Sequence, residues 1–306
     1  MRLKKTTKKR DLFFAITSLL AGLFVFAILL FITMPKFQFP NKQGLDEQIT
    51  DNQVTNLTTE FTLSDYVSEN IPLLGKNEYN SVPVLMYHHI GTKYDGYLRQ
   101  FPGRVDSNVV KEEHFIQQII YLSENGYYST NMSTLVSVYK NKFKLPPKTI
   151  VLTFDDGYRD FYSSAFPILK KYHMQATINI ITDYIGYPDH LTWEMLKEIR
   201  NSGLITIASH SKSHPSMPTL TASRIVEEAE ISKHVLEEGL GIKITDFCYP
   251  SGSFNDNVVN ALQTAGYTDA VTTQPGKWKA NIDPFKIPRQ RISYNNSLEF
   301  FKKQLL

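Results

Sequence analysis

Between residues 81 and 292, two kinds of apolar pattern alternate along the chain. Short apolar runs are typical of strands, and segments with apolar residues every three or four positions are typical of helices. The predicted strands are 82–89, 149–154, 176–182, 204–209, 244–249, 268–273 and 287–292. The predicted helices are 111–127, 161–173, 192–203, 221–238 and 255–266. This alternation indicates an α/β fold, and roughly seven strands suit a parallel barrel wrapped in helices better than an open sheet.

The longest apolar run, "LFFAITSLLAGLFVFAILLFITM", occupies residues 12–34 and contains no charged residue. Its 23 residues are enough to cross a hydrocarbon core of about 30 Å. Six lysines and arginines precede it within the first ten positions, and such a basic flank stays in the cytoplasm. We therefore expect a basic cytoplasmic tail at 1–11 and a single transmembrane signal-anchor at 12–34. The chain after this anchor would then lie outside the cell membrane.

A cleaved signal peptide is the alternative for this segment. Its apolar stretch would be shorter, about 7–15 residues, and would end in a small-residue cleavage site. The run instead ends in "FITMPKF", which offers no such site. Residues 35–80 are polar and follow neither apolar pattern, so we expect an extracellular linker or stalk there, with a small packed subdomain as the alternative.

Composition narrows the function classes. The chain has 306 residues, 42% of them hydrophobic, which is enough for a large core. Its net charge of +3 comes from the basic N-terminus, so no nucleic-acid surface is expected. No protein partner can be inferred. Cys248 is the sole cysteine, which excludes an intrachain disulfide, and we interpret it as a core thiol.

Titratable or turn-forming residues follow four of the predicted strands. His88 and His89 end the first strand, and Asp155 and Asp156 follow the strand 149–154. The segment "SHSKSHP" follows strand 204–209, and "YPSG" lies at the end of strand 244–249. Because the carboxyl ends of parallel barrel strands meet on one face, we expect these residues to share a site.

Spacing indicates how these residues could cooperate. Two histidines four positions apart, His210 and His214, can reach one metal ion, and a carboxylate can complete a three-ligand site with a position left for water. Adjacent side chains on a strand point in opposite directions, so one aspartate could bind the ion while the other acts as a general base. Gly157 permits the tight turn after them. Each motif alone is weak, but their combination on predicted strand ends favours a metal hydrolase site.

The motifs "TFDDGY" and "SHSKSHP" together resemble those of the polysaccharide deacetylases of the NodB homology type, carbohydrate esterase family four. The resemblance covers about residues 81–300. In addition, "PVLMYHHI" and "IPRQRI" are similar to the poly-β-1,6-N-acetylglucosamine deacetylase branch. The resemblance implies that residues 81–306 form a catalytic domain with a distorted (β/α)7 barrel. It also implies a divalent metal, most often zinc, and removal of acetyl groups from N-acetylglucosamine units.

Carried over by motif, the resemblance implies a role for each site residue. Asp155 would be the general base and Asp156, His210 and His214 the metal ligands. Arg289 would orient the base, and the backbone N–H of Tyr249 would help hold the oxyanion. Trp193 would lie near the substrate groove, with a core position as the alternative.

Two positions depart from the family pattern. Many relatives use a late histidine as general acid, but this chain has no histidine after His234. In the branch whose first strand ends in "YH", the N-terminal histidine takes the place of this acid, so the resemblance implies His88 as the general acid, with His89 the less favoured choice. Ser251 stands where the branch more often has an aromatic residue, which affects the expected shape of the sugar subsite.

These expectations predict a membrane-anchored, metal-dependent de-N-acetylase that hydrolyses acetamide groups of N-acetylglucosamine in an extracellular or cell-wall glycan. The glycan could be poly-β-1,6-N-acetylglucosamine, peptidoglycan, or a sugar that links a wall polysaccharide to it. The ion could be zinc, cobalt, nickel or iron. A catalytically silent carbohydrate-binding protein and a deacylase of small amides or esters are the alternatives.

Overall fold

A computed structural model of the protein describes residues 81–91, 108–293 and 297–306. The tail, the anchor and the linker predicted for residues 1–80 lie outside the described residues. Within the described ranges, no helix combines the length and the apolar character that a membrane crossing requires.

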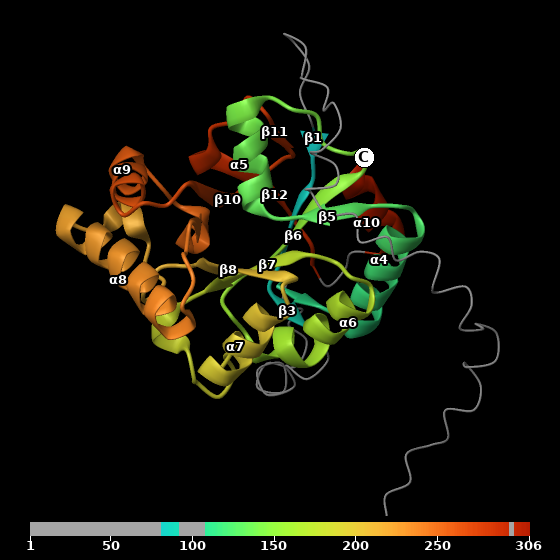
Figure 1. Ribbon diagram of the computed structural model, residues 1–306, viewed down its shortest axis with the longest axis horizontal. Coiled ribbons are helices and arrows are strands. Elements are labelled where there is room, and N and C mark those ends of the chain that lie inside the picture. Colours follow the sequence, from blue (N-terminus) through green and yellow to red (C-terminus); the bar gives the residue numbers. More distant parts are fainter. Residues whose placement is uncertain (1–80, 92–107, 294–296) are drawn as a thin grey trace, which may run out of the picture. The chain divides into compact units, whose positions relative to one another are not determined.

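The described chain is built around a closed parallel barrel (Figure 1). Its seven strands follow the order β2-β12-β10-β9-β8-β7-β6, and pairing of β2 with β6 closes the ring. The strands are β2 (Val84–Tyr87), β6 (Thr149–Phe154), β7 (Ala176–Ile180), β8 (Ile205–Ser209), β9 (Asp246–Cys248), β10 (Asp269–Pro275) and β12 (Ile287–Arg291). The predicted α/β fold and seven-stranded barrel are therefore confirmed.

An additional short strand, β5 (Tyr128–Thr130), lies outside the ring. It pairs with residues 149–151 of β6, whereas β7 pairs with residues 153–154. Because β2 occupies the other edge of β6 over residues 151–154, β5 and β7 must share one edge. This sharing is one distortion of the barrel.

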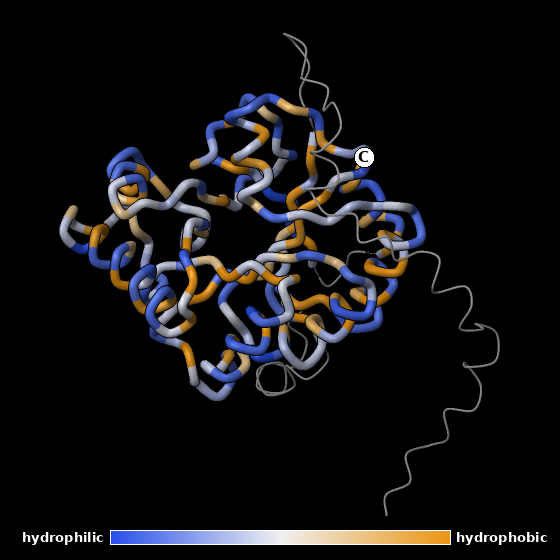
Figure 2. Tube along the Cα trace, viewed as in Figure 1, coloured by the Kyte–Doolittle hydropathy of each residue, from blue (hydrophilic) through white to orange (hydrophobic). Residues whose placement is uncertain are grey.

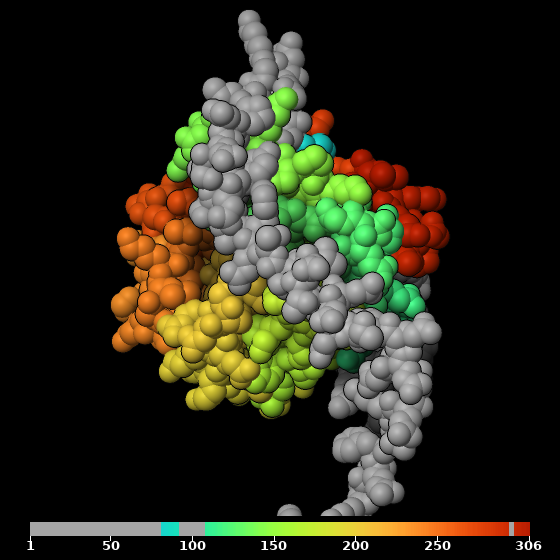
Figure 3. Space-filling model, turned by 45° about the vertical axis from the view of Figure 1, so that its right-hand side comes forward, coloured from blue at the N-terminus to red at the C-terminus, as the bar shows by residue number. Residues whose placement is uncertain are grey.

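The helices cover the outside of the barrel (Figure 1). They are α4 (Glu112–Glu124), α5 (Met132–Asn141), α6 (Phe166–Lys171), α7 (Trp193–Asn201), α8 (Ala222–Leu240), α9 (Asp256–Thr264) and α10 (Leu298–Leu305). A π-helical turn, Phe161–Ala165, precedes α6, and short 3-10 turns span Thr182–Tyr184, Met217–Thr219, Pro250–Gly252 and Pro284–Lys286. The terminal helix α10 packs against α4, and Figure 3 shows the red and green segments side by side.

Two small sheets flank the barrel. Strand β1 (Ser81–Val82) pairs antiparallel with β11 (Trp278–Lys279), and β3 (His89–Ile90) pairs parallel with β4 (Val109–Val110). The strand predicted at 82–89 is therefore split into three pieces. The break between β2 and β3 falls at His88.

Local chemistry explains where the helices begin and end. The side chains of Asn131, Thr192 and Asn255 accept a hydrogen bond from the backbone N–H three residues later, which caps the N-termini of α5, α7 and α9. Gly241, at φ +65°, ends α8 in the left-handed conformation that a residue without Cβ adopts at low cost.

Burial follows the parallel arrangement. All residues of β6 and β7 are buried, as expected for strands covered on both faces. Figure 2 shows hydrophobic positions concentrated along the central strands and hydrophilic ones along the outer helix surfaces. Polar residues that lie at the strand ends despite this burial therefore need a specific explanation.

Candidate active site

The polar residues singled out by the sequence converge at the carboxyl ends of the barrel strands. His88, Asp155 and His210 directly follow β2, β6 and β8, which end at Tyr87, Phe154 and Ser209. Asp156 and His214 come later in the loops after β6 and β8. The residues brought together there are His88, Asp155, Asp156, His210, His214 and Arg289.

Asp155 is held in one orientation by a buried clamp. Arg289 donates from Nη1 to Oδ1 at 2.7 Å and from Nη2 to Oδ2 at 2.8 Å, and Asn179 Nδ2 donates to Oδ1 at 2.7 Å. Burial raises the pKa of Asp155, but the charge and hydrogen bonds of Arg289 outweigh it and hold this pKa well below its usual range. The carboxylate is therefore charged at any physiological pH.

Arg289 is itself fully engaged. Besides the two bonds to Asp155, it donates from Nε to the carbonyl of Thr272 at 2.8 Å, from Nη1 to Thr153 Oγ1 at 2.9 Å and from Nη2 to Cys248 Sγ at 3.3 Å. A guanidinium has five N–H donors, so every donor has an acceptor. This arrangement fixes the plane of the Asp155 carboxylate, at the position where the resemblance places an orienting arginine.

Asp156, His210 and His214 form a group that could hold a metal ion. Asp156 Oδ1 lies 3.3 Å from His210 Nε2 and 3.6 Å from His214 Nε2, and the three ligand atoms lie within 4.8 Å of one another. His210 Nδ1 lies 2.8 Å from the carbonyl oxygen of Cys248, which fixes the orientation of the ring and turns Nε2 toward Asp156. Two imidazoles and one carboxylate are the donor set of many catalytic zinc sites, so the residues fit the expected ion.

The electrostatics of Asp156 agree with this arrangement. Burial raises the pKa of its carboxyl, but the hydrogen bond and charge of His210 outweigh that effect and lower the pKa to about 2. The carboxylate is therefore ionised at neutral pH, as a metal ligand must be.

The group depends on unusual backbone conformations. Asp156, Ser211 and His214 have φ values of +72°, +64° and +61°. Left-handed conformations of residues other than glycine cost of order 1–3 kcal/mol each and cluster at functional sites. Gly157 continues the turn at φ +73°, and a Cβ there would lie 3.1 Å from Ile180 Cδ1.

A fully buried glutamate of α8, Glu228, supports the loop that carries both histidines. Its Oε2 accepts from the N–H of Ser213 at 2.8 Å, and its Oε1 accepts from the hydroxyl of Ser213 at 2.7 Å and from Arg224 at 3.3 Å. Ser213 precedes His214 directly, so Glu228 fixes the position of that candidate ligand. Nothing in the sequence pattern singles out this glutamate from its neighbours on the helix.

We expect Glu228→Gln to weaken metal binding by about 10- to 100-fold, the effect of losing an outer partner of a metal ligand. Glutamine keeps the size of the side chain. Its NH2 group, however, would face either the N–H or the hydroxyl of Ser213, which both donate to Glu228, so one of these hydrogen bonds would be lost. Equilibrium dialysis with Zn²⁺ measures the affinity, and Glu230→Gln, at an exposed position of the same helix, is the matched control. Unchanged affinity in a folded Glu228→Gln variant would show that the loop holds its shape without this contact.

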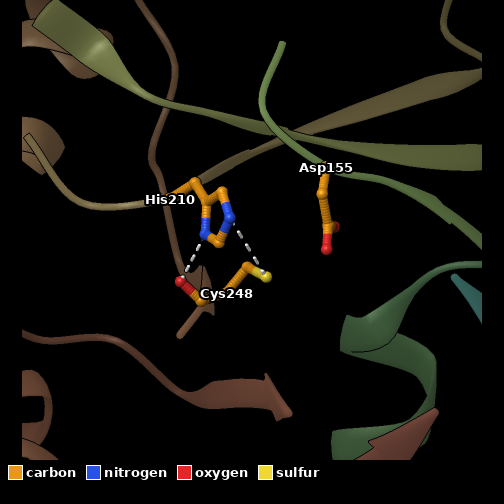
Figure 4. A group of neighbouring side chains, drawn as sticks. All are labelled: Asp155, His210 and Cys248. Carbon is orange, nitrogen blue, oxygen red and sulfur yellow. Dashed lines mark hydrogen bonds between the residues drawn. The ribbon is translucent and has the colours of Figure 1, made fainter. Parts of the chain in front are cut away.

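A second candidate group shares His210 with the first (Figure 4). It combines Asp155, His210 and Cys248, but both oxygens of Asp155 already accept from Arg289. Burial raises the pKa of the Cys248 thiol, which disfavours the thiolate that metal binding requires. The Cys248 Sγ also lies 4.0 Å from the same Nε2 that faces Asp156. We therefore favour the group containing Asp156.

The two neighbouring histidines have different surroundings. His88 Nε2 lies 3.8 Å from Asp155 Oδ2, and its buried Nδ1 has no hydrogen-bond partner within the described part of the chain. His89 Nδ1 lies 2.6 Å from Asp160 Oδ2, and its ring stacks on Tyr158 at 3.5 Å. Only His88 is placed beside Asp155, which agrees with the preference stated from the sequence.

The expected oxyanion donor, the amide of Tyr249, has a backbone partner in this structure, and its role stays a prediction. Its N–H donates to the carbonyl of Val271 at 3.2 Å where β9 continues beside β10, and its hydroxyl donates to the carbonyl of Phe285 at 3.0 Å. Two residues on, Ser251 has φ +55°, and its N–H has no acceptor among the residues that the structure describes. The amide of Ser251 is therefore a second candidate donor in this turn.

Trp193 occupies the first turn of α7 and packs against α8. A Cβ added at Gly239 would collide with its six-membered ring. This packing supports the core position that the sequence left open, rather than a place in the substrate groove.

Sequence reasoning missed several residues that shape the site. Asn179 and Thr153 lie inside fully buried strands, and a polar residue within such a run is a signal that could have been used. The contact between the Cys248 carbonyl and His210 could not be predicted from the sequence, since every residue type has a backbone carbonyl.

The fold and the site define a class: a parallel α/β barrel with a candidate metal site of two histidines and an aspartate beside a clamped carboxylate. Comparisons with known proteins identify the family within this class. Residues 142–270 match the family model described as polysaccharide deacetylase. YxkH of Bacillus subtilis (strain 168), which is named as a member of the polysaccharide deacetylases, is 32% identical over 212 residues, covering 69% of this chain and 71% of that protein.

Two further relatives extend the comparison. The poly-β-1,6-N-acetyl-D-glucosamine N-deacetylase of Staphylococcus epidermidis is 28% identical over 268 residues, covering 82% of this chain and 92% of the relative. The structure of the deacetylase PplD of Streptococcus pyogenes in complex with acetate superimposes with a TM-score of 0.69 at 29% identity, covering 74% and 99% of the two chains. The chain belongs to the polysaccharide deacetylase family. This membership confirms both the resemblance seen in the sequence and the assignment of the chain as an enzyme, a polysaccharide N-deacetylase.

Proposed function

We propose that this enzyme is anchored in the cell membrane and removes acetyl groups from N-acetylglucosamine residues of an extracellular or cell-wall glycan, with a divalent metal as cofactor. The observation that carries this proposal is the clamped Asp155 beside the group of Asp156, His210 and His214. Hydrolysis of an acetamide needs a charged group to take a proton from water and a centre to stabilise the oxyanion. Asp155 would be the charged group, and the group of Asp156, His210 and His214 would hold the ion that stabilises the oxyanion.

Asp156, His210 and His214 would hold the ion, zinc being the first choice for this donor set. Such an ion supplies Lewis-acid polarisation of the acetamide carbonyl and lowers the pKa of the attacking water. Asp155 receives the proton of that water on a carboxylate whose plane Arg289 and Asn179 fix. The N–H groups of Tyr249 and Ser251 are the candidate donors to the oxyanion of the tetrahedral intermediate.

His88 would return a proton to the departing amine. Burial lowers the pKa of His88, and the nearby carboxylates Asp155 and Asp156 offset this only in part, so the imidazole is neutral at pH 7. It must therefore gain a proton during the reaction before it donates one. Asp155, 3.8 Å away, is the nearest group that would carry that proton.

The candidate substrates are related glycans that contain N-acetylglucosamine. The Staphylococcus epidermidis relative is named for poly-β-1,6-N-acetyl-D-glucosamine, which supports that polymer. The acetate in the Streptococcus pyogenes structure is the product that deacetylation releases. The apolar run 12–34 supports an enzyme tethered at the membrane, where peptidoglycan and wall-linkage sugars are equally within reach.

Release of free amine from two substrates tests the proposal. The full chain, solubilised in detergent and loaded with Zn²⁺, is incubated with purified wall glycan and with a β-1,6-linked N-acetylglucosamine oligomer, and Asp155→Asn serves as the control. We expect release from at least one substrate that the control abolishes. Release from only one of them assigns the polymer class. Absence of release from both, in a protein that binds the metal, would reject the proposed glycan in favour of a different acylated substrate.

A further inference from the structure

Four aromatic rings form a continuous row in and beside the loop 182–191 that joins β7 to α7, here called the aromatic loop. The rings of Tyr184 and Tyr187 stack at 5.5 Å with an interplanar angle of 22°. His190 meets Tyr184 edge-on at 5.1 Å and lies 5.0 Å from Tyr158. Tyr187 is 55% exposed, and Tyr184, His190 and Tyr158 are partly exposed. We call these four residues the aromatic row.

The aromatic loop is fastened to the segment that carries the two histidine ligands. The N–H of Thr182 donates to the carbonyl of Ser211 at 3.3 Å, and the N–H of Asp183 donates to the carbonyl of Lys212 at 2.9 Å. Both acceptors lie between His210 and His214. The start of the loop therefore has a fixed position relative to the metal group.

The other end of the loop is fastened to the turn that carries the aspartates. The N–H of Leu191 donates to the carbonyl of Gly157 at 3.0 Å, and the N–H of Arg159 donates to the carbonyl of Asp189 at 2.9 Å. The Arg159 side chain also donates from Nε to the carbonyl of His190 at 3.3 Å. The row thus begins two residues from Asp156, at Tyr158, and runs outward on a loop that both ligand-bearing segments hold.

Stacking between the rings stabilises the loop, but burial in the core does not explain Tyr187, which is 55% exposed. A tyrosine that is more than half exposed, as Tyr187 is, offers an apolar ring and a hydroxyl to a ligand that has both C–H faces and hydroxyl groups. A pyranose ring has this chemistry. Several hydrogen bonds already hold the loop, so binding would need little further ordering of the protein.

We propose that the aromatic row is a sugar-binding subsite for the hexosamine unit adjoining the one that is deacetylated, with Tyr187 as its outermost platform. This inference rests on the proposed function, because it assumes that the acetamide is cleaved at the neighbouring metal group. It makes the enzyme selective for chains over single sugars.

The test compares Tyr187→Ala with wild type on β-1,6-linked N-acetylglucosamine pentamer and on the monosaccharide, using the full, zinc-loaded chain. We expect KM for the pentamer to rise about three- to tenfold, the factor that one aromatic contact is worth, and the loss in kcat/KM to be larger for the pentamer than for the monosaccharide. Tyr187→Phe should restore most of the lost affinity. Phe300→Ala, an aromatic residue of α10 that is 42% exposed, is the matched control and should behave as wild type.

Two results would overturn the subsite while leaving the proposed function intact: an unchanged KM for the pentamer, or an equal loss on pentamer and monosaccharide. If wild type hydrolyses no glycan, the proposed function fails instead, and calorimetric binding of the intact pentamer then decides on the subsite. Weaker binding by Tyr187→Ala would support it, and absence of binding to wild type would reject it.

Discussion

Asp155→Asn is expected to lower the deacetylation rate by about 10²- to 10⁴-fold, the contribution of a positioned general base. The substitution keeps the shape of the side chain but removes its charge. The amide can no longer take a proton from water, and its NH2 group faces either Arg289 or Asn179, which are both donors. Metal binding should persist, because Asp156, His210 and His214 are untouched.

The same substitution should also destabilise the fold. It leaves the buried guanidinium of Arg289 without its counter-charge, and breaking a buried ion pair from one side typically costs about 3–5 kcal/mol. Activity must therefore be expressed per folded, metal-loaded molecule, with circular dichroism and metal analysis beside the assay. Asp256→Asn, an exposed aspartate at the start of α9, controls for loss of a negative charge. A folded variant that keeps more than a tenth of the wild-type rate would exclude Asp155 as the base.

The pKa directions explain why Asp155 and His88 need to be considered together. Asp155 is a weak base because Arg289 stabilises its charged form, and His88 is neutral because burial disfavours its charged form. The protonated form of Asp155 is therefore unfavourable. Transfer of the proton to the imidazole of His88, 3.8 Å away, would restore the carboxylate. The pair can thus pass one proton from water toward the leaving amine.

Much of the fold could be predicted because barrel strands are buried on both faces. Strand 149–154 was predicted with the bounds of β6, since its apolar run has polar residues at both ends. The helix predicted at 111–127 ends near Gly126, at φ +68°, which also follows from local chemistry. Strand β5 and helices α5 and α10 were not predicted. β5 has only three residues, too few to show a period, and its pairing with an already shared edge of β6 depends on the folded barrel.

The residues of the candidate site, like the fold, could be predicted only in part. The residues that follow strand ends could be predicted, because parallel topology brings the ends together whatever the intervening chain does. Contacts made across the barrel could not. The sequence could not show which amide of the turn 249–251 is available to an oxyanion, because that depends on how β9 runs beside β10, which no local pattern records. Arg289 was placed by family resemblance alone. A single arginine in the sequence does not indicate which residue, here 134 positions away, will be its partner.

Loss of one ligand of the metal group should abolish both metal binding and activity. His214→Ala removes one of three protein ligands, so zinc affinity should fall by more than the 10- to 100-fold typical of outer-shell changes. Chelation of wild type should remove activity, and added Zn²⁺ should restore it in wild type but not in the variant. His234→Ala, an exposed histidine of α8, is the control for loss of an imidazole.

The decisive comparison sets His214→Ala against Cys248→Ala, because the two candidate groups share His210 but differ in these residues. Cys248→Ala keeps the backbone carbonyl that lies 2.8 Å from His210 Nδ1, so it should keep the metal. Metal lost in His214→Ala and retained in Cys248→Ala assigns the ion to Asp156, His210 and His214. The reverse result would move the ion to Asp155, His210 and Cys248. Asp155 would then be a ligand and could no longer serve as the base, and the proton would have to be taken by His88 alone.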